Sequence, residues 1–305
     1  MQTIYVPTLN EAASDQVRIY VPTINDSPSD FQNLFRLWQQ VQYSRTGAIF
    51  DFSNCTFLRP NAVAFLGGIA RVSQQSGRPA NFQWDSVAPP VLVNLCQSGF
   101  AKAFGHLVPG WGGHSIPYRE DRTSASDPIL DYLTDQWLGR GWLNISEMLR
   151  DAIVGTVWEV YANSFEHGQS PVGVFSCGQH FKNGNELILS VADFGAGIPT
   201  KVRQFLREDP RSKSLRPGAC LNWAFQRGNS TAARAVARGL GLDLLREFVC
   251  LNDGSLEVYS ENGHALINRS GAYFADLPIG FSGTMVQIKL KCDERFYRFK
   301  SETNS

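Results

Sequence analysis

A carboxylate and a carboxamide stand four residues apart in a segment with a helical pattern. Glu159 and Asn163 belong to the stretch from about Ser146 to Glu166, in which most other side chains are apolar. Residues four apart project from the same face of a helix, so both side chains point the same way. A carboxylate can orient and deprotonate a water molecule, and an amide oxygen is a hard ligand suited to Mg²⁺. The alternative is that both residues are simply solvated on an amphipathic helix.

A second candidate is the turn at Asp193, which follows a predicted strand over 186–191. Gly195 and Gly197 come at alternate positions after the carboxylate. Glycine lets the backbone approach a ligand closely and adopt unusual dihedral angles. A carboxylate at a strand end can accept a hydrogen bond from an exocyclic amine such as that of adenine. The alternative is an ordinary turn that contains an aspartate.

A basic segment leads to a second glycine-rich turn, which opens a predicted helix that ends near Val249. Residues 201–238 contain nine lysines and arginines, the last of them Arg238, against two acidic residues. Free N–H groups at a helix N-terminus with flanking glycines, here Gly239 and Gly241, are suited to a phosphate. The segment therefore suits a basic cover over a polyphosphate, with a solvated basic loop as the alternative.

We expect helices and strands in both halves of the chain to position these residues. The first half has an α/β or α+β order over roughly 100 residues, with a near-repeat at 4–10 and 19–25 that predicts two short strands. Its further expected helices and strands are helices over 29–42, 62–75 and 90–104 and strands over 48–52 and 80–84. In the second half, we expect the long helix over 146–166 and strands over 172–175, 186–191, 255–259 and 284–290.

The chain divides at a segment that shows no hydrophobic period. Residues 109–127 combine glycines and prolines with a charged run, a composition typical of a linker or surface loop. We therefore expect one domain over 1–108, a linker over 109–127, a second domain over 128–296 and a tail over 297–305. At about 150 residues per domain, a length of 305 residues agrees with two domains.

The composition argues against several classes of protein. The 28 lysines and arginines balance 28 acidic residues, so no net positive charge draws the chain to nucleic acid or to an anionic membrane. No apolar run approaches the roughly 18 residues that span a bilayer, and we expect no signal peptide. The six cysteines are far apart and form no Cys-x-x-Cys, which argues against a zinc site or a redox pair. We expect reduced thiols in a cytoplasmic protein.

The order and spacing of the motifs in the second half resemble the ATP-binding module of the GHKL superfamily. This superfamily groups gyrase-type ATPases, histidine kinases and anti-sigma-factor kinases. The resemblance covers about 128–292 and rests on Glu-x-x-x-Asn, Asp-x-Gly-x-Gly, a basic segment that ends in Gly-x-Gly-Leu, and a final Gly-Thr pair at 283–284. The local sequence from Trp158 to Gly168 is most similar to that of the anti-sigma-factor-kinase branch.

This resemblance implies an α/β sandwich that binds ATP and Mg²⁺. It implies that Asn163 binds Mg²⁺, that Glu159 is the general base, and that Asp193 binds the adenine amine. The remaining residues that it assigns to the nucleotide site belong to the glycine-rich turns and the last strand: Gly195 and Gly197 at the base, Arg238, Gly239, Leu240 and Gly241 at the phosphates, and Thr284 near Asp193. His167 follows the Asn163 motif, and we assign it no role.

The first half resembles a STAS domain, the anti-sigma-antagonist fold. The resemblance rests on the stretches 50–53 and 57–63 and on a last helix that contains 94–100. Regulated STAS domains carry a phosphorylatable serine at the start of a helix, where this chain has Arg59, Pro60 and Asn61. Because Asn61 cannot accept a phosphate, the resemblance implies a docking or sensing module.

Three functions remain open on the sequence. The first is an ATP-dependent conformational switch for a protein partner, with slow hydrolysis by Glu159. The second is a kinase that phosphorylates a serine or threonine of a partner; no dimerisation helix with an acceptor histidine is evident before residue 146. The third is a non-catalytic ATP- or ADP-binding module in stress or phage-defence signalling. The sequence does not identify the partner, and it leaves a homo-oligomer open.

Overall fold

Two β-sheets with helices between and beside them make up the computed structural model, which describes residues 16–106, 112–226 and 240–304. The helices are α1 (Pro28–Tyr43), α2 (Pro60–Gln75), α3 (Pro89–Gln97), α4 (Phe100–Ala103), α5 (Ser126–Asp131), α6 (Glu147–Asn163), α7 (Ile198–Phe205), α8 (Pro217–Ala224) and α9 (Leu240–Leu251). The strands are β1 (Val17–Tyr20), β2 (Ala48–Asp51), β3 (Ala80–Gln83), β4 (Ser115–Asp121), β5 (Val174–Phe181), β6 (Glu186–Asp193), β7 (Ser255–Asn268) and β8 (Gly271–Lys291). The fold is therefore mixed α/β.

The two sheets differ in the direction of their strands. The small sheet is parallel, in the order β1-β2-β3, as expected when helices connect successive strands. The large sheet is antiparallel, in the order β4-β5-β6-β8-β7. The mixed α/β class agrees with the sequence analysis.

Both faces of the large sheet are apolar. Successive side chains of a strand point to opposite faces, so neighbouring residues enter different cores. One core receives Val174, Val191, Val258 and Val286. The other receives their neighbours Phe175, Ala192, Tyr259 and Met285. The sheet must therefore be covered on both sides.

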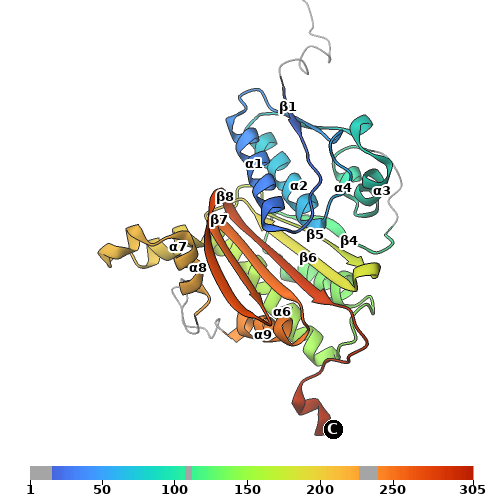
Figure 1. Cartoon of the computed structure of the whole chain (residues 1–305), viewed down its shortest axis with the longest axis vertical. Coiled ribbons are helices and arrows are strands. Elements are labelled where there is room, and N and C mark those ends of the chain that lie inside the picture. Colours follow the sequence, from blue (N-terminus) through green and yellow to red (C-terminus); the bar gives the residue numbers. More distant parts are fainter. Residues whose placement is uncertain (1–15, 107–111, 227–239, 305) are drawn as a thin grey trace, which may run out of the picture.

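Helices α1 and α2 cover one face of the large sheet. Helix α2 packs on β5 and β6 as well as on β3 of the small sheet, and α1 packs on β8 (Figure 1). A helix between two sheets has no solvent-facing side, and α2 is buried nearly all round from Pro60 to Ala70. The first half of the chain thus forms a layer on the back of the sheet, which we call the N-terminal layer (residues 16–106).

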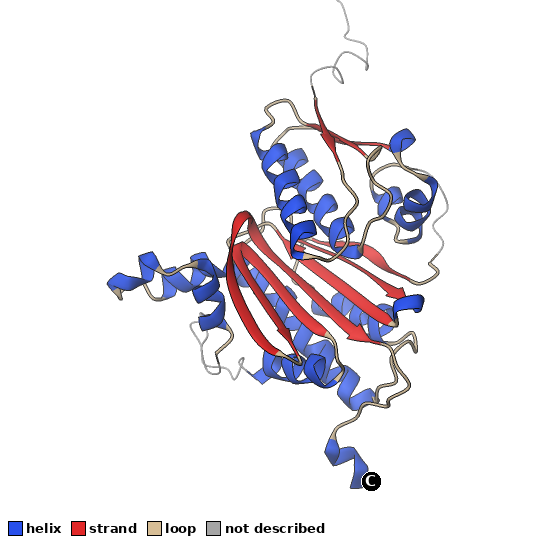
Figure 2. Cartoon of the chain, viewed as in Figure 1, coloured by secondary structure: helices blue, strands red, loops and turns tan. Residues whose placement is uncertain are grey.

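Helices α6 and α9 cover the opposite face (Figure 2). Helix α6 begins at the expected place, because the Ser146 hydroxyl accepts a hydrogen bond from the Leu149 N–H. After Asn163 the chain continues as a π-helical turn, Ser164–Gly168. Within the described ranges, no helix is both long and apolar enough to cross a bilayer.

Three expectations about elements need correction. The segment 109–127 is not a loop throughout, because it contains β4 at the edge of the large sheet. Pro117 and the charged residues hide the strand pattern, and an edge strand tolerates both. The expected helix over 90–104 is two helices, because Gly99 adopts φ +80° between α3 and α4. The strands at 255–259 and 284–290 belong to one long hairpin that includes 260–283. The first copy of the near-repeat, 4–10, lies outside the described residues.

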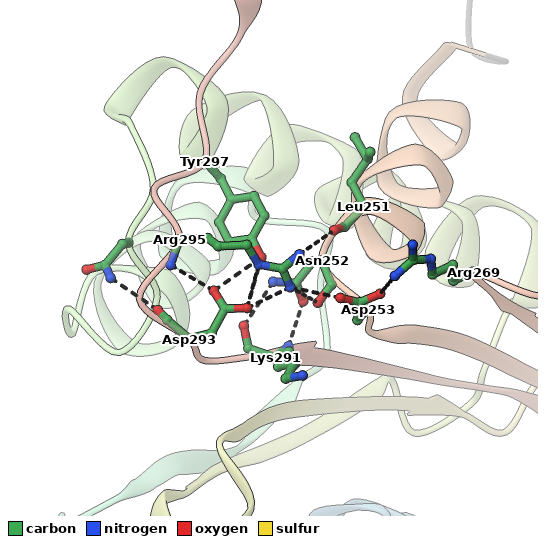
Figure 3. Close-up of polar contacts among 9 residues, drawn as sticks. Leu251, Asn252, Asp253, Arg269, Lys291, Asp293, Arg295 and Tyr297 are labelled. Atoms are coloured by element: carbon green, nitrogen blue, oxygen red, sulfur yellow. Dashed lines mark hydrogen bonds and ion pairs between the residues drawn. The ribbon is translucent and has the colours of Figure 1, made fainter.

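The C-terminal segment is tied to the start of α6. Tyr297 forms a β-bridge with Ile145, and the Tyr297 carbonyl accepts a hydrogen bond from the Ser146 N–H. Figure 3 shows Arg295 between the carboxylates of Asp253 and Asp293, at 3.0 and 2.6 Å. The first residues of the expected tail over 297–305 are thus part of the folded unit.

Candidate functional site

One cavity of about 230 Å³ lies between α6, the α7–α8 region, α9 and the face of the large sheet that α6 and α9 cover. Glu159, Asn163, Asp193 and Thr284 all line it. These residues come from a helix and two strands that are distant in sequence. The structure therefore brings together four of the residues that the sequence analysis selected.

Helix α6 forms one wall of the cavity. Glu159 and Asn163 lie one turn apart on it, and both face the cavity. The π-helical turn that follows contributes Ser164, His167 and Gly168 to the same wall. A π-helical turn widens the helix locally and is common at functional sites. The sequence does not reveal it, because its residues also fit a continued α-helix.

Asp193 is the most deeply buried acid of the cavity. The exposed fraction of this residue is 2%. One carboxylate oxygen accepts a hydrogen bond from the Gly195 N–H at 3.0 Å, and the other lies 3.0 Å from the Ser164 hydroxyl. Burial disfavours the charged form and raises the pKa of Asp193 to about 6, against the lowering effect of these hydrogen bonds. The two hydrogen bonds thus hold the carboxylate in one place, and its raised pKa brings its change of charge closer to neutral pH.

Strand pairing sets the position of Asp193 against β8. Asp193 lies opposite Thr284, as expected, and the Thr284 hydroxyl lies 2.9 Å from that of Ser260 on β7. The preceding Gly283 has φ +130°, and a Cβ there would lie 2.1 Å from the Asp193 carbonyl oxygen. Only glycine allows β8 to approach β6 this closely.

Gly195 and Gly197 do not line the cavity, contrary to expectation; their neighbours Ala196 and Ile198 do. A Cβ on Gly195 would lie 1.9 Å from the carbonyl oxygen of Gly168, so this glycine allows two backbone segments to pass each other. A Cβ on Gly197 would lie 2.8 Å from the Ser260 hydroxyl. Both glycines shape the site indirectly, through close packing of the turn.

Two cations also line the cavity: Lys201, which the sequence analysis counted only as part of the basic segment, and Arg246, which it did not select. Lys201 on α7 makes no ion pair with any residue that the structure describes. The Arg246 guanidinium on α9 donates to the Phe225 carbonyl at 2.9 Å and lies 3.5 Å from the Asp243 carboxylate. Lys201 belongs to the basic segment, which is its only signal in the sequence. Arg246 has none, because its approach depends on how α9 packs.

The expected glycine-rich turn before α9 is only partly described. Arg238 and Gly239 lie outside the described residues, and the helix α9 begins at Leu240 and includes Gly241. The rest of the cavity wall is mostly apolar or aromatic. It includes Val160, Ile198, Val202, Trp223, Phe225, Leu256, Val258 and Val286. In the sequence these residues look like ordinary core residues, which is why they were missed.

The donor set fits a hard cation better than a soft one. No group of three or more His, Cys, Asp or Glu side chains that could hold a metal occurs among the described residues. Mg²⁺ does not need such a cage, because it retains water and takes few protein oxygens when it arrives with a phosphate. The exposed Asn163 side chain can supply one such oxygen.

Comparison with known proteins leaves the site to be interpreted from its own chemistry. A scan against protein-family models gives no match to the chain, and a search of curated proteins finds none that is similar. The arrangement itself has an apolar pocket, one buried carboxylate, a helix edge with a carboxylate and a carboxamide, and two cations. These are the features on which a functional assignment must rest.

Proposed function

We propose that this chain binds a magnesium complex of an adenine nucleotide in the cavity beside α6. The observation that carries the proposal is the convergence of Asp193, Asn163 and Glu159 on one apolar cavity. The resemblance of the same motifs to the GHKL superfamily supports the same ligand. A cavity of about 230 Å³ is smaller than the roughly 300–1,000 Å³ of typical ligand sites, so the described residues would enclose only part of the nucleotide.

The adenine base would lie against the sheet. The buried Asp193 carboxylate would accept a hydrogen bond from the exocyclic amine, which is a donor that guanine lacks at that position. The apolar side chains of Val258 and Val286 line the same cavity and suit the flat face of a purine. Burial in this apolar setting makes the hydrogen bond more specific, because an unpaired polar group is costly there.

The phosphates and the metal would lie toward α6 and the basic residues. Asn163 would offer its amide oxygen to Mg²⁺, and Lys201 and Arg246 would offset phosphate charge. A bound ATP supplies the phosphoanhydride bond, and Glu159 is suited to orient and deprotonate the attacking water. The resulting activity would be slow ATP hydrolysis, coupled to a change of shape that a protein partner recognises.

Calorimetry and phosphate release together test this function. We expect the parent chain to bind Mg·ATP, Asp193→Asn and Asn163→Ala to weaken binding, and Glu159→Gln to bind ATP without releasing phosphate. Lys182→Ala serves as a control, because Lys182 is exposed on the 3₁₀ turn Lys182–Gly184, lies outside the basic segment and does not line the cavity. An absence of binding heat for the parent with both Mg·ATP and Mg·ADP would refute the proposal. Binding without turnover would leave a nucleotide-binding module and remove the hydrolytic role of Glu159.

A further inference from the structure

The residue after Asp193 points away from the cavity, into the N-terminal layer. Phe194 is 4% exposed, and its ring lies 5.2 Å from the ring of Phe65 on α2 and 5.3 Å from that of Trp38 on α1. The ring also lies 5.7 Å from that of Phe281 on β8. Asp193 ends β6 and lines the cavity, whereas the next side chain, Phe194, belongs to the core under the N-terminal layer. The peptide bond between these two residues therefore connects the candidate site to that layer.

A glycine on α2 receives the Phe194 ring. A Cβ on Gly68 would lie 1.9 Å from Cε2 of Phe194 and less than 3 Å from two more atoms of that ring. The ring cannot simply turn aside, because aromatic side chains surround it in a close-packed core. The position of α2 therefore determines where Phe194 can lie.

The adjacent glycine makes the same kind of contact elsewhere. A Cβ on Gly67 would lie 2.1 Å from the hydroxyl oxygen of Tyr118, on the edge strand β4. The Tyr118 hydroxyl donates to Glu120 at 3.0 Å, and neither residue lines the cavity. Two neighbouring glycines of one helix thus contact two buried rings. The ring of Phe194 belongs to the residue next to Asp193 in the sequence, whereas Tyr118 is next to no candidate site residue.

The link continues from Phe194 into the cavity wall. Asp193 is fixed on one side by strand pairing with β8 and on the other by the Ser164 hydroxyl at 3.0 Å. Ser164 opens the π-helical turn directly after Asn163. A shift of Phe194 would consequently move the Asp193 carboxylate relative to α6.

We propose that Phe194 is a positioning residue through which helix α2 of the N-terminal layer sets the place of Asp193, and so couples that layer to nucleotide binding. This inference rests on the proposed function for its consequence, but its structural part does not. A movement or deformation of α2 would change nucleotide affinity without any contact between the N-terminal layer and the nucleotide. The coupling works in both directions, so nucleotide binding would also bias the position of α2.

The experiment compares Gly68→Ala with Gly67→Ala in the full chain. We expect Gly68→Ala to weaken Mg·ATP binding by about tenfold, within the roughly 5–150-fold range of coupling between sites. Gly67→Ala adds the same methyl group to the same helix, so we expect it to lower stability with little effect on affinity. If both variants weaken binding equally, or neither does, the proposed coupling is wrong.

A double-mutant cycle adds a readout that general destabilisation would not give. Phe194→Leu removes the ring edge that the new methyl group meets, so Gly68→Ala should change affinity less than about twofold in that background. Gly67→Ala should still lower stability, with little effect on affinity, in the Phe194→Leu background. If Gly68→Ala does not fold, Phe194→Leu alone is compared with Phe82→Leu, a buried ring of the N-terminal layer that contacts Phe50 and Phe100. Equal affinity losses in these two variants would overturn the proposal.

Hydrogen exchange without nucleotide separates this proposal from the proposed function. We expect Gly68→Ala to accelerate amide exchange in residues 164–170 and 193–198, and Gly67→Ala to accelerate it in 115–121. If the parent chain binds no nucleotide while the two variants show these different exchange patterns, the proposed function is refuted and the structural link is retained. The same exchange pattern in both variants would refute the link itself.

Discussion

At the scale of single residues, the site holds a carboxylate in an environment that opposes its charge. Asp193 has a pKa of about 6 because it is buried, against an ordinary value of 3.8. That difference corresponds to a cost of about 3 kcal/mol when the group is ionised in the folded chain. Groups whose pKa is raised in this way by burial are typical of functional sites.

Replacing this carboxylate should make the apo chain more stable at neutral pH. In Asp193→Asn the amide can donate to the Ser164 hydroxyl, which lies 3.1 Å from the Val160 carbonyl and can donate to it. The parent loses stability as the pH rises through the folded pKa of about 6, and it pays no such cost below 3.8. We expect the variant to gain up to about 3 kcal/mol above pH 7 and nothing near pH 4, measured by denaturant unfolding. A less stable variant at pH 8 would contradict this.

The cation on α7 should contribute to binding of the phosphates and not to binding of the base. We expect Lys201→Ala to weaken ATP binding about fivefold, the size of a partly exposed ion pair of about 1 kcal/mol, and to leave adenosine binding unchanged. Lys182→Ala makes the same change in net charge, outside the basic segment and away from the cavity. An equal loss for ATP and adenosine would show that Lys201 acts through packing instead.

The sequence predicted the site residues that carry a local pattern. Glu159 and Asn163 share a helical face, and Asp193 follows a strand and precedes glycines, so their geometry depends mainly on local structure. Lys201 and Arg246 reach the cavity only because α7 and α9 pack beside α6. The opposite error, at Gly195 and Gly197, arose because a glycine required for close packing looks the same in sequence as one required for a ligand.

At the scale of elements, the C-terminal segment stabilises the start of the helix that carries Glu159 and Asn163. The Ser146 hydroxyl caps α6 and donates to the Glu302 carboxylate at 2.8 Å. We expect Ser146→Ala to lower the free energy of unfolding by about 1 kcal/mol or more, measured in urea. Glu302→Ala removes the acceptor and leaves the cap, so it should cost less. Equal costs would contradict a capping role.

The elements that the sequence analysis missed share a physical cause. Strand β4 lies at an edge and has a register shift between Ile116 and Arg119, so its side chains do not follow a simple alternation. The distal part of the β7–β8 hairpin also has shifts near Glu261. Periodicity predicts elements that follow one period, such as α1 and α6, and it fails where a bulge changes which side chains face the core.

At the scale of the whole molecule, the two halves share one hydrophobic core. Phe31 and Phe35 of α1 stack on Tyr259 and Phe281 of the large sheet, with ring centroids 4.1 and 5.0 Å apart. At the start of α2, the Arg59 guanidinium lies 2.9 Å from the Glu186 carboxylate on β6. The sequence could not predict this sharing, because an apolar helix face does not state which sheet it will cover.

A shared core should make unfolding cooperative across both halves. We expect one calorimetric transition for the full chain and no cooperative transition for a fragment of residues 112–305, whose sheet would expose an apolar face. The fragment should also bind a hydrophobic dye. A fragment that unfolds cooperatively and leaves the dye unbound would show two independent domains.

The most direct test of the central claim is photolabelling of the chain with 8-azido-ATP and Mg²⁺, followed by peptide mapping. We predict that excess ATP will prevent the labelling and that the label will fall in residues 156–168 or 193–202, two segments that contain residues lining the cavity beside α6. Labelling that excess ATP does not prevent, or protected labelling confined to the hollow beside Arg71 and Trp84 on the N-terminal layer, would contradict the account.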